Sequence, residues 1–321
     1  MKHHICLLVV FTVFFAPCIS CAYATTDILP LDDALRATYT ACIGIDDEMQ
    51  HLKTMAGINT AVTAVGTAAG VGATVTGFVK ANKDELIEKL EMEKLRRIEE
   101  SGINSAYKNP LKSNVLSNID NAKTGYMTNA DSNEIQSEID QLTTQSKNLG
   151  NWRTGLLAAN TATNIAGAAI AGTNKVDKDL ENQIKSCVSA VEGLRKSMMQ
   201  ARMEGADITE AQSIADACGE YEFVDVSKIN KRATGAMASS VVGAATGLAG
   251  TVVSGVANSN SVRNDNSVAG KKKEKDMNTA ANVLSIGATA ASASATIFNA
   301  TQISAIKKVA VVSEKCTGIL K

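Results

Sequence analysis

Four long stretches of this chain carry no charged side chain, and they limit its possible folds more than any other feature. They span residues 54–79, 154–174, 233–262 and 277–306. All four are rich in Ala, Gly, Ser, Thr and Val, and none contains proline. A β-sandwich or barrel needs aromatic and β-branched strands with frequent turn signals, yet aromatic residues make up only 4% of the chain. The sequence therefore predicts an all-α fold.

Two of the stretches contain nearly the same glycine-rich string. GTAAGVGATVTG occupies 66–77 and GAATGLAGTVVSG occupies 243–255. Their small residues step by four, three and four, so each set lies on one face of a helix. The two faces are Gly66, Gly70, Ala73 and Gly77, and Gly243, Gly247, Gly250 and Ser254. A glycine inside a helix costs about 1 kcal/mol relative to alanine. We expect close helix–helix packing along these faces to offset that cost.

The repeated string is part of a longer internal duplication. The offset from Gly66 to Gly243 also brings Cys42 within one residue of Cys218. Each half then contains two uncharged helices between two cysteines, which predicts two tandem antiparallel helical hairpins. The first hairpin repeat covers 25–205 and includes a charged coiled-coil arm at about 80–150, and the second covers 206–321.

The flanking segments have apolar residues at coiled-coil spacing. One such seam precedes the first stretch, a second follows the second stretch, and a third begins in the arm. Their members are Leu35, Thr38, Cys42, Ile45, Met49, Leu52 and Ala56; Leu180, Ile184, Cys187, Val191, Leu194 and Met198; and Ile135, Ile139 and Leu142. Antiparallel hairpins bring the cysteines of each half to the same open end. We therefore favour the disulfides Cys42–Cys187 and Cys218–Cys316 among the three connectivities that four cysteines allow.

The first 24 residues have the features of a secretory signal peptide. A short basic start precedes an apolar run, and Ala22-Tyr23-Ala24 supplies the small residues of a cleavage site after Ala24. In a second interpretation Cys21 is lipidated, although the preceding Cys18-Ile19-Ser20 lacks the usual leucine-like residue. Cleavage leaves the four cysteines named above, and an even number in an exported protein indicates disulfides.

The connections between the uncharged stretches have weaker signals. Residues 83–100 form a charged helix that extends the first stretch, 100–133 are loop-like, and the returning helix starts near Asp131. Asp207 and Glu210 have the spacing of a capping box. The segment 220–227, EYEFVDVS, has some strand character, and we interpret it as an irregular linker.

No pattern in the sequence points to catalysis or to a cofactor. His51 is the single histidine after the leader, and no His/Cys cluster has zinc spacing. The acidic pairs Asp32-Asp33 and Asp46-Asp47 are typical of helix starts and solvated faces, and no phosphate-binding loop or nucleophile elbow is present. Trp152 is expected at a packing junction, with an anchor at a membrane interface as the alternative, and the sequon at Asn299 lies within an expected helix. We predict no catalytic, cofactor-binding or metal site, and no small-molecule substrate is identified.

Charge and hydropathy leave two functional classes open. Acidic and basic residues nearly balance, 33 against 32, which argues against a nucleic-acid partner. The first hypothesis is an exported, non-enzymatic structural or interaction protein of the periplasm or cell exterior, with the arm contacting a protein partner or a second copy. The alternative is an integral or membrane-active helical-hairpin protein that associates through its glycine faces. The uncharged stretches are long enough to cross a bilayer, but their Asn and Thr residues oppose it.

Overall fold

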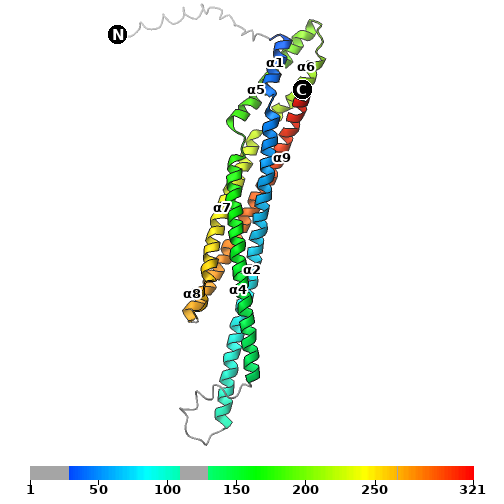
Figure 1. The fold of residues 1–321 in the computed structure, drawn as a ribbon. Coiled ribbons are helices and arrows are strands. Elements are labelled where there is room, and N and C mark those ends of the chain that lie inside the picture. Colours follow the sequence, from blue (N-terminus) through cyan, green and yellow to red (C-terminus); the bar gives the residue numbers. More distant parts are fainter. Residues whose placement is uncertain (1–28, 109–128, 266) are drawn as a thin grey trace, which may run out of the picture. The chain divides into compact units, whose positions relative to one another are not determined.

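A computed structural model describes residues 29–108, 129–265 and 267–321, and every regular element in these ranges is helical (Figure 1). The elements are α1 (Leu31–Cys42), α2 (Ile45–Lys108), α4 (Asn129–Thr173), α5 (Lys178–Met203), α6 (Thr209–Gly219), η1 (Glu220–Phe223), α7 (Val226–Ala257), α8 (Asn260–Arg263) and α9 (Val268–Leu320). The expected all-α fold is confirmed for this part of the chain. The proposed leader, 1–24, lies outside the described residues.

The contacts divide the chain into two compact units. Unit 1 contains the described residues up to Asp46 together with Asp179–Val224 and Val311–Lys321, and unit 2 contains Asp47–Lys178 and Asp225–Ala310. Each unit therefore takes segments from both halves of the sequence. The division into 25–205 and 206–321 describes a repeat along the chain and stays a prediction, whereas the folded chain groups its segments differently.

Unit 2 is built from four long helices that run side by side, α2, α4, α7 and α9 (Figure 1). Their cross-contacts show an antiparallel order. Between α2 and α9, Asn59 bonds Asn299, whereas Thr74, further along α2, bonds Ser285, which is earlier in α9. The α4–α7 pair behaves likewise, with Thr154 on Ser254 and Thr161 beside Gly247. These contacts join helices that are far apart in the chain, since α5, α6 and η1 lie between α4 and α7, and all the elements from α4 to α8 lie between α2 and α9.

The charged arm is a continuation of two of these helices. Helix α2 is unbroken from Ile45 to Lys108, so the loop expected to start at residue 100 begins later than the sequence indicated. Polar side chains join the two helices: Lys83 donates to Gln145 at 2.6 Å and Lys94 donates to Gln136 at 2.6 Å. The last part of the expected loop, 129–133, is already helical, because α4 begins at Asn129, and 109–128 lie outside the described residues.

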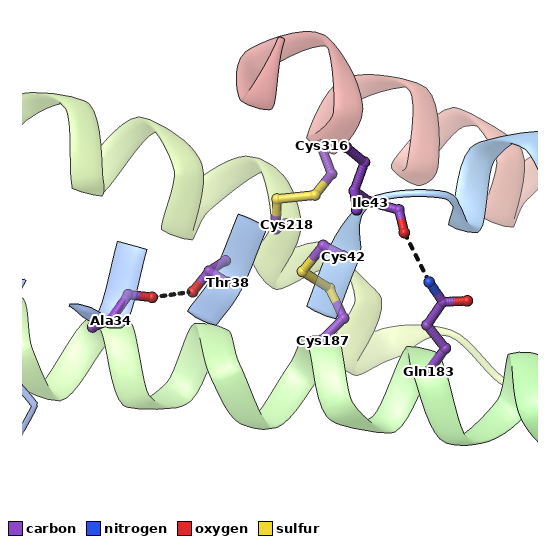
Figure 2. The surroundings of a disulfide bond; sticks show 8 residues. All are labelled: Ala34, Thr38, Cys42, Ile43, Gln183, Cys187, Cys218 and Cys316. Atoms are coloured by element: carbon purple, nitrogen blue, oxygen red, sulfur yellow. Dashed lines mark hydrogen bonds between the residues drawn. A yellow bond between two sulfur atoms is a disulfide. The ribbon is translucent and has the colours of Figure 1, made fainter. Parts of the chain in front are cut away.

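Unit 1 is held by two disulfides, Cys42–Cys187 and Cys218–Cys316, which are the two pairs that the sequence favoured. Their Cα atoms are 4.8 Å and 4.6 Å apart, within the range that a disulfide requires. The first bridge lies next to a break at Gly44, whose φ of 90° is the left-handed conformation that glycine adopts most easily. The break separates α1 from α2 within a seam that periodicity alone presented as continuous. Gln183 secures it by donating to the Ile43 carbonyl at 2.8 Å (Figure 2).

Two local expectations in unit 1 need correction. The N-cap of α6 is Ile208 rather than Asp207, whose carboxylate instead accepts from the Thr209 backbone N–H at 3.0 Å. Residues 220–227 are not irregular throughout: η1 is a turn of 3-10 helix, and α7 begins at Val226, capped by Asp225. The two aspartates make the same kind of bond to a backbone N–H two residues ahead, but Asp207 makes it one residue before the N-cap, whereas Asp225 is itself the N-cap.

A buried tyrosine makes unit 1 sensitive to alkali. Tyr221 is 1% exposed, and burial raises its pKa to about 12, with a smaller contribution from the charge of Asp46 in the same direction. In the unfolded chain the same tyrosine has its ordinary pKa of about 10. The stabilisation from the neutral phenol is therefore complete below pH 10 and is lost as the pH rises towards 12, by about 3 kcal/mol.

Replacing Tyr221 with phenylalanine removes the titrating hydroxyl while keeping the ring. We expect the unfolding temperatures of native protein and Tyr221→Phe to diverge above pH 10, with the variant losing less stability. Thermal melts followed by circular dichroism across this pH range measure the difference. Parallel curves would show that Tyr221 is not the group responsible.

Candidate functional site

The interior of unit 2 is lined by small and polar side chains. The two small-residue faces identified in the sequence are buried at every position. Polar residues continue the same rows, and the buried ones in unit 2 include Asn59, Thr63, Asn160, Thr161, Asn164, Ser240, Ser254, Ser285, Ser292, Asn299 and Gln302. Among large apolar side chains of the four uncharged stretches, only Leu157, Val262 and Ile306 are buried. Along the uncharged stretches, the core of this bundle therefore consists mainly of Ala, Gly and polar side chains.

The glycines allow neighbouring helices to bring polar side chains into that core. A Cβ at Gly70 would lie 2.7 Å from Thr289 Oγ1 and 3.2 Å from the Thr289 Cα. At Gly243, a Cβ would lie 2.8 Å from the Asn164 amide. Real Cβ atoms essentially never come within 3.0 Å of another atom, so a side chain at either position would displace the neighbouring Thr289 or Asn164. Both glycine faces contact helices of the same chain.

Amide and hydroxyl groups link α9 to α2 and α4 in successive layers. Asn59 donates to Asn299 at 2.9 Å, and Asn299 donates to Thr63 at 3.2 Å. One layer along, Asn164 donates to Ser292 at 2.7 Å, and Ser292 donates to Asn160 at 2.8 Å. Buried networks of this kind fix helix register because each member needs its partner.

The network leaves several buried polar atoms without a partner among the described residues. They are Asn59 Oδ1, Asn160 Nδ2, Asn164 Oδ1, Ser240 Oγ, Asn282 Oδ1, Gln302 Oε1, and Nε and Nη2 of Arg153. An unpaired buried polar atom costs about 1–3 kcal/mol, so the interior of unit 2 has unused capacity for hydrogen bonding.

The outer surface of the same bundle is apolar. Large apolar side chains that are 39–66% exposed lie on all four helices. They include Ile58, Val65, Val71, Val75 and Phe78 on α2; Trp152 and Ile165 on α4; Val241, Val242, Leu248, Val252 and Val256 on α7; and Val283, Ile286, Ile297 and Phe298 on α9. By length and composition, three helical segments in the described chain could cross a membrane: Leu31–Glu99, Val226–Ala257 and Ala269–Leu320. Soluble proteins distribute these residue types in the opposite way.

Unit 2 buries two charged side chains, Lys80 of α2 and Arg153 of α4, near the point where these helices continue into the arm. Lys80 is 1% exposed and lies 2.5 Å from Asp84 and 3.7 Å from Glu274. Asp84 also accepts from Ser146 of α4. Arg153 of α4 is equally buried, but no carboxylate of the described chain lies within ion-pair distance of it.

The four cysteines lie together in unit 1 (Figure 2). The Sγ atoms of Cys42, Cys187 and Cys316 are within 4.8 Å of one another, and all three residues are buried. Such a cluster has the composition of a soft-metal site. Thiolates are needed as ligands, however, and here all four sulfurs are bridged, which favours a purely structural role.

The other residues singled out in the sequence do not form a site. His51, Asp32, Asp33 and Asp47 are exposed on helix surfaces. Trp152 is 66% exposed and does not occupy the packing junction expected for it. Asn299 is fully buried and hydrogen-bonded, so the folded chain does not offer its sequon for glycosylation.

Sequence reasoning missed the interior amides. None of Asn160, Asn164 and Arg153 was singled out from the sequence. The spacing contained the signal, since Asn160, Asn164 and Gly167 step by four and three and therefore share one face of a helix. Comparisons with family models, curated proteins and solved structures found no match for this chain.

Proposed function

We propose that this chain is an exported, non-enzymatic membrane protein whose unit 2 crosses the bilayer as a four-helix bundle. The observation that carries the proposal is the distribution of side chains in unit 2, with amides, hydroxyls and glycines inside and Val, Ile, Leu and Phe outside. In lipid, helix association depends on small residues and polar contacts between helices, and polar residues face the bundle interior.

The energetics favour lipid over water for this distribution. In water, a bundle gains stability by burying large apolar side chains, at about 25 cal/mol per Å². Along its uncharged stretches, unit 2 instead buries mainly Ala, Gly, Ser and Asn, and Leu157, Val262 and Ile306 are the only large apolar side chains that it buries there. An exposed apolar surface that covers four helices marks an interaction with a partner or a membrane. The fourth helix, α4, is not one of the three segments that qualify as spans by length and composition. Its uncharged stretch, 154–174, nevertheless covers about 31 Å at 1.5 Å per residue, which matches a hydrocarbon core of about 30 Å.

The proposal also predicts on which side of the membrane the remaining parts of the chain lie. Four antiparallel spans place the disulfide-bonded segments, which need an oxidising environment, in the exported compartment. The arm and Lys271–Lys273 then lie on the opposite side, as the positive-inside rule favours. The arm displays charged side chains on two helices, so we assign partner contact to it.

The internal duplication fits the same proposal. Equivalent positions of the two halves, such as Gly66 and Gly243 or Gly77 and Ser254, occupy the interior of one bundle. The glycine faces then hold α2, α4, α7 and α9 together within one chain. Association between copies through these faces, which was part of the membrane hypothesis, would require the bundle to open, so we do not retain it.

Fractionation of cells that make the full-length protein tests the proposal. We expect the chain to stay with the membranes after an alkaline carbonate wash and, because alkali weakens unit 1, also after a urea wash at neutral pH. A Cys21→Ser variant should behave identically, which separates spanning helices from a lipid anchor. Release of both forms into the soluble fraction would overturn the proposal in favour of a soluble exported interaction protein.

Cysteine labelling tests the topology with a matched pair of exposed positions. Met203, at the end of α5, is 83% exposed, and Lys272, near the start of α9, is exposed as well. In intact cells with a permeable outer envelope, a membrane-impermeant maleimide should label Met203→Cys but not Lys272→Cys. After the membrane is solubilised, it should label both.

A further inference from the structure

Arg153 is a fully buried cation with an unused recognition edge. Its side chain is 1% exposed, and Nε and Nη2 have no hydrogen-bond partner in the part of the chain that the structure describes. These two nitrogens carry parallel N–H bonds on one edge of the guanidinium, the arrangement that binds two oxygens of a carboxylate or phosphate. A buried charge without a counter-ion is unfavourable, so this edge indicates a missing anion.

The neighbouring acidic groups do not supply that anion. Asp84 is occupied by Lys80 and by the Ser146 hydroxyl. Glu274 lies 3.7 Å from Lys80, which makes it a second counter-ion to the same lysine. No carboxylate of the described residues forms an ion pair with Arg153, and Lys80 adds a second buried positive charge on the adjacent helix α2.

The surroundings of Arg153 are shaped to admit its side chain. A Cβ at Gly77 of α2 would lie 3.2 Å from both Nε and Cζ of Arg153, and it would collide with Asn282 Oδ1 of α9. Glycine at position 77 therefore lets the guanidinium of α4 and the Asn282 amide of α9 both approach α2 at the same point. The Asn282 Oδ1 is also unpaired, and rotation of this amide would turn its N–H₂ towards a bound anion as a further donor.

We propose that Arg153, with Asn282 beside it, binds an oxyanion with two adjacent oxygens, a phosphate or a carboxylate. The inference does not depend on membrane insertion, because the four helices themselves bury the guanidinium. It adds a ligand site to a chain whose sequence indicated none. The same chemistry is offered by a free phosphate and by a phospholipid headgroup, and the experiment distinguishes these sources.

The test uses the purified full-length protein in mild detergent, with thermal unfolding as the readout. Inorganic phosphate should raise the unfolding temperature in a saturable way relative to chloride at equal ionic strength. Arg153→Met should lose this response, and Lys272→Met, which removes an exposed cation, should keep it. The oxyanion is a headgroup if native protein responds to a phospholipid in the micelle but not to inorganic phosphate, and if Arg153→Met does not respond to the phospholipid.

Two further results complete the test. Arg153→Lys keeps the charge but lacks the two parallel N–H bonds. It should therefore need at least a tenfold higher anion concentration for the same rise in unfolding temperature. It also provides a folded comparison if Arg153→Met does not fold. Equal responses of native protein and Arg153→Lys, or no response to either source of phosphate or to acetate, would overturn the proposal. Retention of the chain in membranes is a separate measurement, so the two proposals can fail independently.

Discussion

Replacing Leu248 with aspartate should prevent stable retention of the chain in membranes. Leu248 is near the centre of the uncharged stretch in α7 and is 58% exposed on the outside of unit 2. At the centre of a spanning helix, aspartate costs about 2.5–3.5 kcal/mol, and the leucine contribution of about 0.3–0.6 kcal/mol is lost as well. The sum of about 3–4 kcal/mol lowers the insertion equilibrium more than a hundredfold.

A matched substitution separates this effect from a general one. Phe223, at the end of η1 in unit 1, is 85% exposed, so Phe223→Asp makes the same kind of change on a surface assigned to water. We expect Phe223→Asp to leave retention unchanged. Substitutions on a surface in water usually change the free energy of unfolding by less than about 0.5 kcal/mol. If both variants change it by no more than this and are retained equally well, the outer face of unit 2 does not contact lipid.

Replacing Gly70 with leucine should unfold unit 2. The side chain would meet Asn160 of α4 and both the hydroxyl and the backbone of Thr289 in α9. The backbone contact is decisive, because a side chain can rotate away but a helix axis can move only by separating the bundle. Overpacking of this kind costs about 3 kcal/mol, and it also breaks the adjacent amide layer. The unfolding temperature in detergent, followed by circular dichroism, measures the loss.

The same helix offers a control for this substitution. Gly57 is exposed in α2, and a Cβ there would meet nothing within 4 Å. Gly57→Leu should raise stability by up to about 1 kcal/mol, since leucine is the better helix former. Opposite signs for the two variants would show that glycine is needed for packing at position 70 only. Equal effects would contradict the interior assigned to the Gly70 face.

The all-helical character could be predicted because it depends on local patterns. Long breaker-free stretches, seams at three- and four-residue spacing, and the steps of the small-residue faces are periodicities that a helix converts directly into faces. The disulfide pairs were also predictable, since antiparallel helices bring the ends of each half together. The break at Gly44 and the turn at Asp207 were not, because each depends on one or two local hydrogen bonds and backbone angles that helical periodicity does not reveal.

The sequence by itself determined which residues share a helix face, but not what each face contacts. Periodicity treats a row of Gly, Ser and Asn and a row of Val and Ile as two stripes, and either stripe can face the core. Only the tertiary structure decided that the polar stripe is inside, because four helices can approach closely only through their smallest side chains. The same packing buried Arg153 with no acidic partner among the described residues. That juxtaposition of α2, α4 and α9 depends on contacts between residues far apart in the chain, which no local pattern encodes.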